Sequence, residues 1–321
     1  MKKVLMTLAA VALVAFFSSC NKEDDVQPMS FQKKLAEVHK YVYSNESGEW
    51  EFVENEKNEY FEWDGDRLVK WHNSNFPNVM TDSFAYDNAG RLITSFVKDS
   101  VTGEESFASY EYEDERIAKI LLYTLDSVLE AEYDITYVDG KLSNIFVTYF
   151  DASLAKSSSP IMVRQRNMLN RTYPEASQLV KAAQQTKGVT LSYNTHYMWG
   201  EDGSSTACFE LFGIRDTLTL TYGNMPNPYF GFYDFNYIDE TFILMSFPMF
   251  APTLPTTFCK RGNLGNADGE FLYEFDGDYV TQCTYYTPAQ SRNDDGTYNY
   301  YIERTVTTYK YTVMPASPVS E

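Results

Sequence analysis

The sequence predicts an all-β protein: an antiparallel meander of hairpins that forms an open or barrel-like sheet, with one short helical insertion near residues 174–187. Three observations support this prediction. Apolar and polar residues alternate along many short segments, turn residues punctuate these segments, and one sequence phrase recurs. The 321 residues include 26 Tyr, 22 Phe and 4 Trp, which supply enough apolar surface for a sizeable core.

The recurring phrase starts with alternating aromatic residues, continues through an acidic or glycine-containing turn to a basic residue, and ends in an alternating apolar strand. Its copies cover residues 60–71, 84–96, 110–120, 135–145 and 273–281. Period-two alternation places the aromatic side chains on one face of a strand. Asp-Gly and Asn-Ala-Gly segments accept the positive φ angles of tight turns. Each copy is therefore predicted to form one hairpin, and consecutive hairpins should pair.

Residues 151–188 interrupt this rhythm. The serine-rich stretch that ends at Pro160 is predicted to be a loop. A short helix is predicted after it, because Pro174 suits a first helical position and Gly188 suits the end. Strands resume at Val189, and the strict alternation of residues 298–313 predicts a long final hairpin arm.

The N-terminal residues predict export followed by lipid anchoring. Residues 1–19 combine a basic start with an apolar run that is too short to cross a bilayer, which is typical of a signal peptide. The Phe-Ser-Ser-Cys sequence that ends at Cys20 resembles a bacterial lipobox, in which the cysteine becomes lipidated. The acidic stretch after it resembles the signal that sends Bacteroides-type lipoproteins to the outer face of the outer membrane; it comprises Lys22, Glu23, Asp24 and Asp25.

These features predict four parts: a lipoprotein signal peptide (1–19), a lipidated cysteine with an acidic flexible tether (20–34), a single β-hairpin-repeat domain (35–314) and a disordered tail (315–321). An ordinary signal peptide with a chance cysteine is the alternative for the first part. The expected location is the outer membrane, lipid-anchored, with surface exposure favoured over the periplasm.

The hairpin phrase resembles the YD repeats of RHS-type proteins. It is more similar to a group of Bacteroides-type (Bacteroidota) outer-membrane lipoproteins of uncharacterised function. These share the Tyr-x-Tyr-acidic-Gly-basic hairpins and a central phrase like residues 218–229. The resemblance covers residues 35–312 and implies an open, porin-like β fold without implying an activity. A membrane-spanning barrel is the less favoured alternative, because a lipid anchor would then be redundant.

No sequence motif points to catalysis, and no catalytic residue, metal site or cofactor is predicted. The three histidines, His39, His72 and His196, do not occur in a metal-binding spacing. Carboxylates are abundant, so a hydrolase with a concealed acid pair stays an alternative. The formal net charge of −19 argues against nucleic acid as a partner. Both a disulfide and simple burial stay open for Cys208, Cys259 and Cys283.

A ligand-binding surface is the favoured function. The segment 217–259 is rich in aromatic residues and poor in charge, so its rings could stack on sugars or pack in a core. The residues predicted to contact a ligand are Tyr222, Tyr229, Phe232, Tyr233, Trp71 and Trp199. We expect a non-catalytic lipoprotein, held to outer-membrane lipid through acylated Cys20, that binds a glycan. A structural component that assembles with an outer-membrane protein is the alternative.

Overall fold

The computed structural model of the chain describes residues 33–75, 78–151, 153–172, 190–211, 214–229, 251–262, 266–292 and 297–313. Residues 31–321 form one compact unit. Cys20, the acidic stretch after it, the helix predicted at 174–187 and the tail from residue 315 lie outside the described residues.

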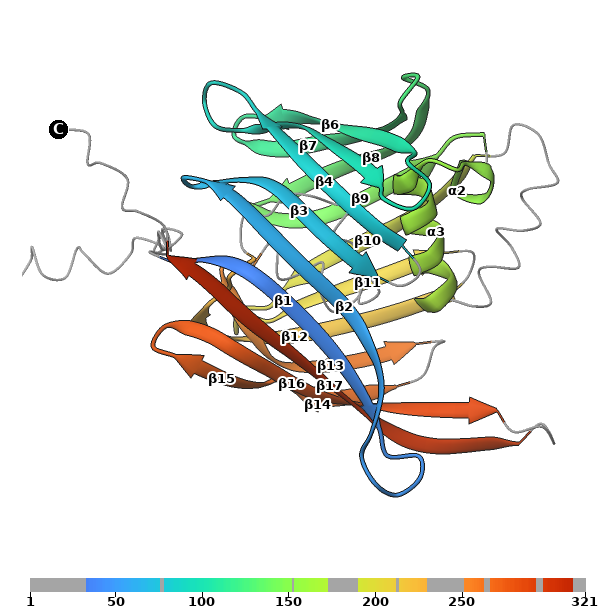
Figure 1. Cartoon of the computed structure of the whole chain (residues 1–321), viewed down its shortest axis with the longest axis vertical. Helices are drawn as coiled ribbons and strands as arrows, with labels where there is room; N and C mark the ends of the chain where they lie inside the picture. The colour runs from blue at the N-terminus through green and yellow to red at the C-terminus, as the bar shows by residue number, and fades with distance from the viewer. Residues whose placement is uncertain are drawn as a thin grey trace, which may run out of the picture. The chain divides into compact units, whose positions relative to one another are not determined.

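Within the described residues, seventeen strands belong to one sheet, and their pairings are antiparallel (Figure 1). The strands, in chain order, are β1 (Lys33–Ser44), β2 (Glu51–Asp64), β3 (Arg67–Asn75), β4 (Asn78–Tyr86), β5 (Leu92–Asp99), β6 (Glu105–Glu113), β7 (Arg116–Thr124), β8 (Leu129–Val138), β9 (Lys141–Tyr149), β10 (Leu191–Trp199), β11 (Ser205–Leu211), β12 (Ile214–Pro226), β13 (Thr253–Gly262), β14 (Ala267–Glu270), β15 (Leu272–Asp276), β16 (Tyr279–Arg292) and β17 (Tyr298–Val313). The predicted meander and its long final arm are confirmed.

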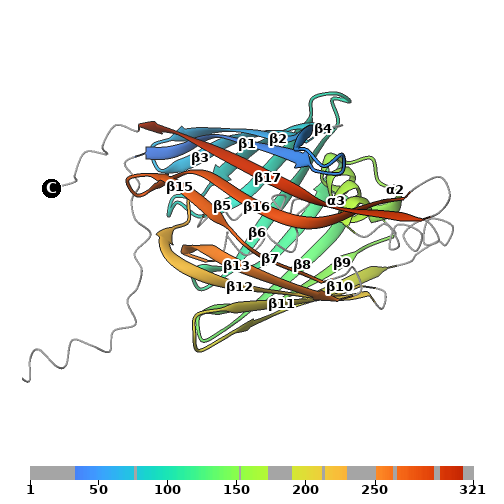
Figure 2. The ribbon, with the colours of Figure 1, turned by 90° about the horizontal axis from the view of Figure 1, so that it is seen from below.

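The sheet curls into a nearly closed barrel because its first strand pairs on both sides. Strand β1 pairs with β2 and also with β17, so the first and last strands lie side by side (Figure 2). On the far side, β9 pairs with β10 across the interruption. The strand pairing switches at Phe271. Strand β14, before this residue, pairs with β13, and β15, after it, pairs with β16.

Each recurring phrase forms the hairpin that the sequence predicts: β2–β3, β4–β5, β6–β7, β8–β9 and β15–β16. The turns explain the choice of residues. Between β8 and β9, Asp139 has a φ of 50° and Gly140 a φ of 77°. Two consecutive positive φ angles are the requirement of a type I′ turn, which matches the twist of the flanking strands.

The phrase also links neighbouring hairpins through a repeated contact, which we call the clasp. The aromatic residue just before the turn of one hairpin donates a hydrogen bond to a backbone carbonyl of the preceding hairpin. That carbonyl belongs to the residue after a basic one, and the basic side chain lies over the aromatic ring. Tyr112, for example, donates to Leu92 O at 2.8 Å under the Arg91 guanidinium. The equivalent aromatics are Trp63, Tyr86, Tyr137 and Trp199. The cations over them are Lys34, Arg67, Arg116 and Lys141.

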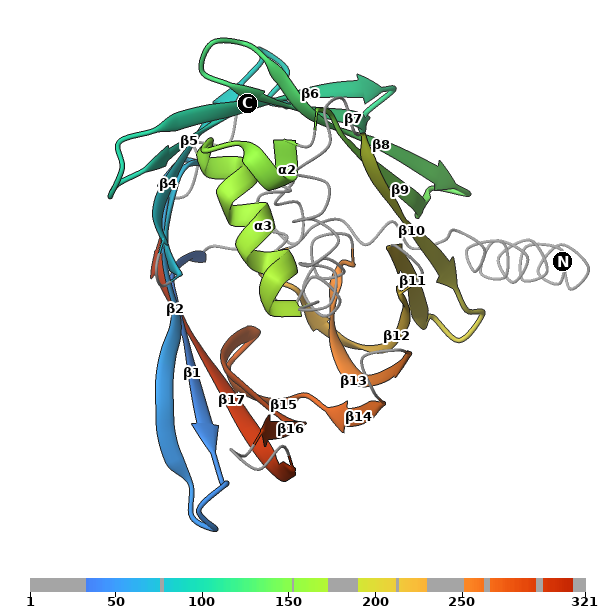
Figure 3. The ribbon, with the colours of Figure 1, turned by 90° about the vertical axis from the view of Figure 1, so that its right-hand side faces the viewer.

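Two helices, α2 (Ser153–Lys156) and α3 (Pro160–Thr172), lie inside the ring of strands (Figure 3). Residues 157–159 form the predicted loop between α2 and α3, and α3, which the sequence did not predict, begins at Pro160. Pro160 suits the first helical position, where its missing N–H is not needed, and Ser159 O accepts the hydrogen bond from Val163 N. No helix among the described residues is long and apolar enough to cross a membrane.

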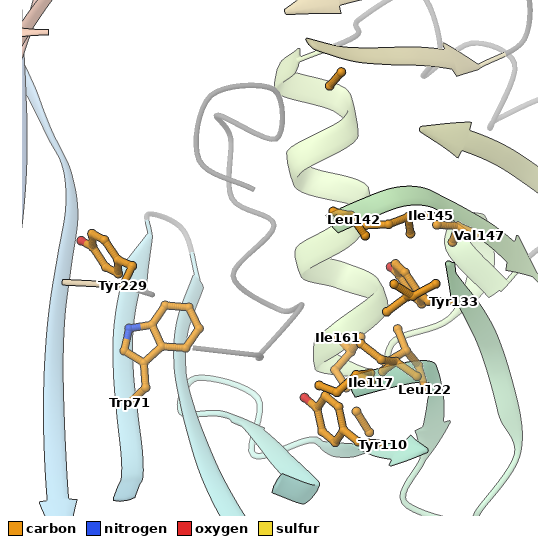
Figure 4. Packing of buried hydrophobic residues seen from close by; sticks show 14 of the residues in the cluster. Trp71, Tyr110, Ile117, Leu122, Tyr133, Leu142, Ile145, Val147, Ile161 and Tyr229 are labelled. Carbon is orange, nitrogen blue, oxygen red and sulfur yellow. The ribbon is translucent and has the colours of Figure 1, made fainter. Parts of the chain in front are cut away.

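The interior holds the hydrophobic core (Figure 4). Side chains from β3, β6, β7, β8 and β9 pack around α3 with Ile161 and Met162 of the helix itself. The largest fully buried side chains are Trp71, Tyr133, Met80, Ile117, Ile120, Ile161, Met162, Leu218, Leu220 and Glu59.

A buried ion pair ties α3 to the barrel wall. Arg164 donates to both carboxylate oxygens of Asp82 on β4, at 3.3 and 2.8 Å, and its guanidinium lies 5.3 Å from the Trp71 ring. Asp82 is fully buried, and burial raises the pKa of its carboxyl group while Arg164 opposes that rise. We call this contact the helix latch.

The outer face of the sheet is polar along much of its length. Lys119 on β7 forms ion pairs with Glu132 and Asp134 on β8. Thr206 and Thr219 share a hydrogen bond between β11 and β12. The alternation along the strands therefore sends apolar side chains inward and polar ones outward.

Candidate ligand-binding surface

Two of the predicted ligand-contact residues are buried in the barrel interior. Trp71 is 1% exposed and Tyr229 is 2% exposed. Trp71 stacks on Phe61 and carries the Arg164 guanidinium, whereas Tyr229 packs edge-on against Tyr309. Neither ring faces solvent, because both belong to the apolar core. For these two residues the structure favours the packing role that the sequence analysis left open.

Trp199 and Tyr222 do come together, with ring centroids 6.4 Å apart and an angle of 22° between the rings. Each also has a structural partner: Trp199 Nε1 donates to Leu142 O at 2.7 Å, and the Tyr222 hydroxyl lies 2.7 Å from Ser205 Oγ. Burial raises the pKa of Tyr222. The pair is half-buried and forms part of a clasp. Phe232 and Tyr233 lie outside the described residues.

A different set of aromatic residues lies on the outer face, where β1 and β2 meet β16 and β17. We call it the aromatic stripe; it comprises Tyr286, Trp50, Phe52, Tyr43, Tyr41, His39 and Tyr60. Tyr43, Tyr41 and His39 occupy alternate positions of β1 and therefore share one face. Phe52 lies opposite Tyr43 in the register, and Tyr60 lies opposite Glu37.

Ring contacts connect most of the stripe. Trp50 packs against Tyr286 at 5.9 Å, and Tyr43 packs against Phe52 at 5.8 Å. Farther along β1, His39 stacks on Tyr41 at 6.4 Å and meets the edge of Tyr60 at 5.8 Å.

Arg304 lies between two rings at one end of the stripe, which we call the wide end; it contains Trp50, Phe52, Tyr43 and Tyr286. The Arg304 guanidinium lies 4.4 Å from the Tyr43 ring centroid and 4.9 Å from that of Trp50. Among the described residues, no acceptor lies within hydrogen-bonding distance of its buried Nε. The two rings therefore hold the guanidinium by cation–π attraction, and the guanidinium in turn fixes the spacing of the rings.

The narrow end of the stripe is rimmed by hydrogen-bonding groups. His39 Nδ1 lies 2.6 Å from Asn58 Oδ1, and its Nε2 lies 3.0 Å from Glu37 Oε2. Lys310 donates to the same Glu37 oxygen at 2.6 Å. These bonds, first the one from Lys310, lower the pKa of Glu37. The stripe thus combines exposed ring surface with charged groups that are paired with each other.

A second, shorter aromatic group occupies the outer face elsewhere. Phe96, Phe107 and Tyr123 lie side by side on β5, β6 and β7, with centroid distances of 6.1 and 4.9 Å. It runs across the strands, and the exposed part of it is mainly Phe96. This group provides a natural comparison for the stripe.

The remaining candidate groups have structural partners. His72 lies 2.9 Å from both Glu62 and Thr81, and His196 lies 2.9 Å from Asn194. Cys208, Cys259 and Cys283 are free thiols. Within the described ranges, no group of three or more His, Cys, Asp or Glu side chains is placed to hold a metal ion.

The stripe was not predicted, although the sequence contains one signal for it. Residues 39–43 alternate aromatic with other residues, which marks one face of a strand. That pattern does not tell whether the face points inward or outward. It also cannot show that Arg304 and Tyr286, more than two hundred residues away, lie beside it.

Fold and surface together define a nearly closed, internally packed β barrel with an aromatic outer stripe. No protein-family model matches the chain, and no curated protein sequence matches it. Among solved structures it is similar to a porin-like protein from Bacteroides uniformis, with 12% identity and a TM-score of 0.47 over 87% of this chain and 98% of that chain. A porin-like protein from Bacteroides vulgatus gives 10% identity and a TM-score of 0.31 over 88% of this chain and 100% of that chain.

Proposed function

We propose that this protein is a lipid-anchored, non-catalytic barrel of the outer membrane that binds a glycan at the cell surface. The observation that carries the proposal is the aromatic stripe on the outer face. Exposed rings offer flat apolar surface to the C–H faces of sugars, and the neighbouring polar groups can bind their hydroxyls. The lipobox-like sequence that ends at Cys20 and the acidic stretch after it support the proposed location.

The polarity of the barrel supports an anchored position over a spanning one. A barrel that crosses a membrane carries an outward-facing apolar band. Here the outward positions of β7 and β8 hold Lys119, Glu132 and Asp134. The interior is filled by the core and by α3, so the fold has the distribution of a water-soluble protein.

The pairing of β1 on both sides disfavours an assembly in which a partner protein adds a strand beside β1. Strand addition needs a strand whose backbone groups are free on one side. Strand β1, the first of the meander, is paired on both sides by β2 and β17. Two of the buried carboxylates have structural roles, because Asp82 holds Arg164 and Asp99 accepts from the backbone N–H groups of Val101 and Thr102.

A glycan-array screen tests the proposed function. The probe is the unlipidated chain, which carries Cys20→Ala and is exported with an ordinary cleavable signal. We expect specific binding to one class of glycan, with the bound material chemically unchanged when it is recovered and analysed. Silence across the array contradicts glycan binding, and a shortened or modified glycan contradicts the non-catalytic part.

A further inference from the structure

We propose that the aromatic stripe binds an extended, uncharged polysaccharide chain that lies along β1, and does not recognise a single terminal sugar. This inference rests on the proposed function, since it names the class of glycan and the place where it binds. It goes further in fixing the shape, the charge and the minimum length of the ligand. Three features of the stripe carry it: its length, its open shape and its charge.

The stripe is too long for one sugar ring. The rows that contain Tyr43 and Glu37 are six residues apart on an extended strand, a distance of about 20 Å. Trp50 and Tyr286 widen the stripe beside Tyr43, because Tyr286 lies in the same register row as Tyr43 on the other side of β17. Rings therefore lie at intervals over a length that several linked sugars would cover, and a single sugar could contact only one part of it.

The exposure of the rings places binding surface at both ends. Trp50 and Phe52, at the wide end, are 41% and 56% exposed, and Tyr60, at the narrow end, is 44% exposed. The rings between them, on β1, are half-buried. A chain that lies on the stripe would thus stack on both ends and pass over Tyr41. Such separated stacking contacts act together only for a ligand that reaches both of them.

The charges along the stripe favour an uncharged ligand. At the narrow end, Glu37 is matched by Lys310 and His39, which leaves no concentrated basic face for a polyanion. At the wide end, the Arg304 charge is covered by two rings. The formal net charge of −19 adds long-range repulsion toward acidic polysaccharides. Neutral sugars avoid this repulsion, and their hydroxyl groups can still hydrogen-bond to the polar groups at the narrow end of the stripe.

The test compares chain length and charge on the unlipidated chain. Binding is measured by calorimetry and by retardation in gels that contain starch, xylan, β-glucan or β-mannan as uncharged polymers. The disaccharide of each polymer gives the short ligand, and polygalacturonate gives the charged one. We expect at least one uncharged polymer to bind at least tenfold more tightly than its disaccharide, and polygalacturonate not to bind.

Three variants locate the site. Trp50→Ala and Tyr60→Ala each remove an exposed ring from one end of the stripe, and Phe96→Ala is the matched control because Phe96 is 50% exposed on a distant part of the outer face. The two stripe variants should each weaken polymer binding roughly three- to tenfold, as expected for one lost stacking contact. Phe96→Ala should bind like the unaltered chain. Circular dichroism confirms that all three keep the β fold.

The outcomes separate this inference from the proposed function. Equal affinity for disaccharide and polymer, a preference for polygalacturonate, or stripe variants that behave like Phe96→Ala would each overturn the inference while glycan binding itself stands. If none of the uncharged polymers binds although the array yields a glycan, the inference fails alone. If neither the array nor the gels yield a ligand, the proposed function fails with it.

Discussion

At the scale of single residues, the clasp explains why each phrase needs both an aromatic residue and a basic one. The basic residue also serves the next hairpin: Arg91 forms an ion pair with Asp87 in the turn of its own phrase and lies 5.1 Å from the Tyr112 ring of the following one. The Tyr112 hydroxyl donates to Leu92 O, the carbonyl directly after Arg91. Two contacts of different kinds thus fix the register between consecutive hairpins.

The substitution Tyr112→Phe removes only the hydrogen bond of one clasp. We expect the free energy of unfolding to fall by about 0.5–1.5 kcal/mol, because the Leu92 carbonyl loses its partner while the ring remains under Arg91. Urea denaturation of the unlipidated chain measures the change. Tyr300→Phe is the control, since Tyr300 is exposed and far from any clasp. An unfolding free energy for Tyr112→Phe equal to that of the control would contradict the role assigned to the clasp.

At the scale of elements, α3 is the part that the sequence did not reveal. The hairpins follow from local signals, because period-two alternation and positive-φ turn residues lie within each phrase. Helix α3 follows from a proline that reads equally well as a loop residue. Its place inside the barrel depends on Asp82, which lies some eighty positions earlier in the sequence. Long-range partners of this kind leave no pattern in one sequence.

The helix latch makes a prediction with a defined pH dependence. Arg164→Met leaves the Asp82 carboxylate buried without its counter-charge, so we expect a loss of about 3–5 kcal/mol in unfolding free energy at neutral pH. Burial already raises the pKa of Asp82 in the folded state, and loss of Arg164 raises it further. The charged form is therefore the destabilised one. The loss should shrink as the pH falls below the folded-state pKa, where Asp82 becomes protonated.

Denaturation curves of the variant at several pH values measure this effect. Adding Asp82→Leu to Arg164→Met removes the buried charge and should restore most of the lost stability at neutral pH. A loss that is independent of pH, or a double variant no more stable than Arg164→Met, would show that the latch acts by packing alone.

The same limit applies to the candidate site. The aromatic-rich segment 217–259 includes Tyr229, which packs in the core, but richness alone does not distinguish the inner face from the outer one. The stripe was hidden because its members come from three strands and a turn at both ends of the chain. Only closure of the barrel between β1 and β17 brings Tyr43 beside Arg304.

At the scale of the whole molecule, the proposed location depends on which side chains face into the barrel and which face outward. Core side chains and α3 fill the interior, and ion pairs such as that between Lys119 and Asp134 occupy the outer face. Among the described residues, exposed apolar side chains occur in the stripe and at Phe96, and also at positions such as Val79, Ile93 and Phe146. The ion pairs on the outer face support the proposal that lipid at Cys20 attaches the protein to the membrane.

Fractionation of cells tests this claim most directly. The wild-type chain is compared with the unlipidated Cys20→Ala chain, exported with an ordinary cleavable signal so that no uncut leader holds it in the membrane. We predict that the wild-type protein sediments with the outer membrane and that the unlipidated chain stays in the soluble fraction as a folded β protein, because we propose that lipid at Cys20 anchors the protein to the bilayer. An unlipidated chain that still sediments with membranes and resists extraction without detergent would contradict the account.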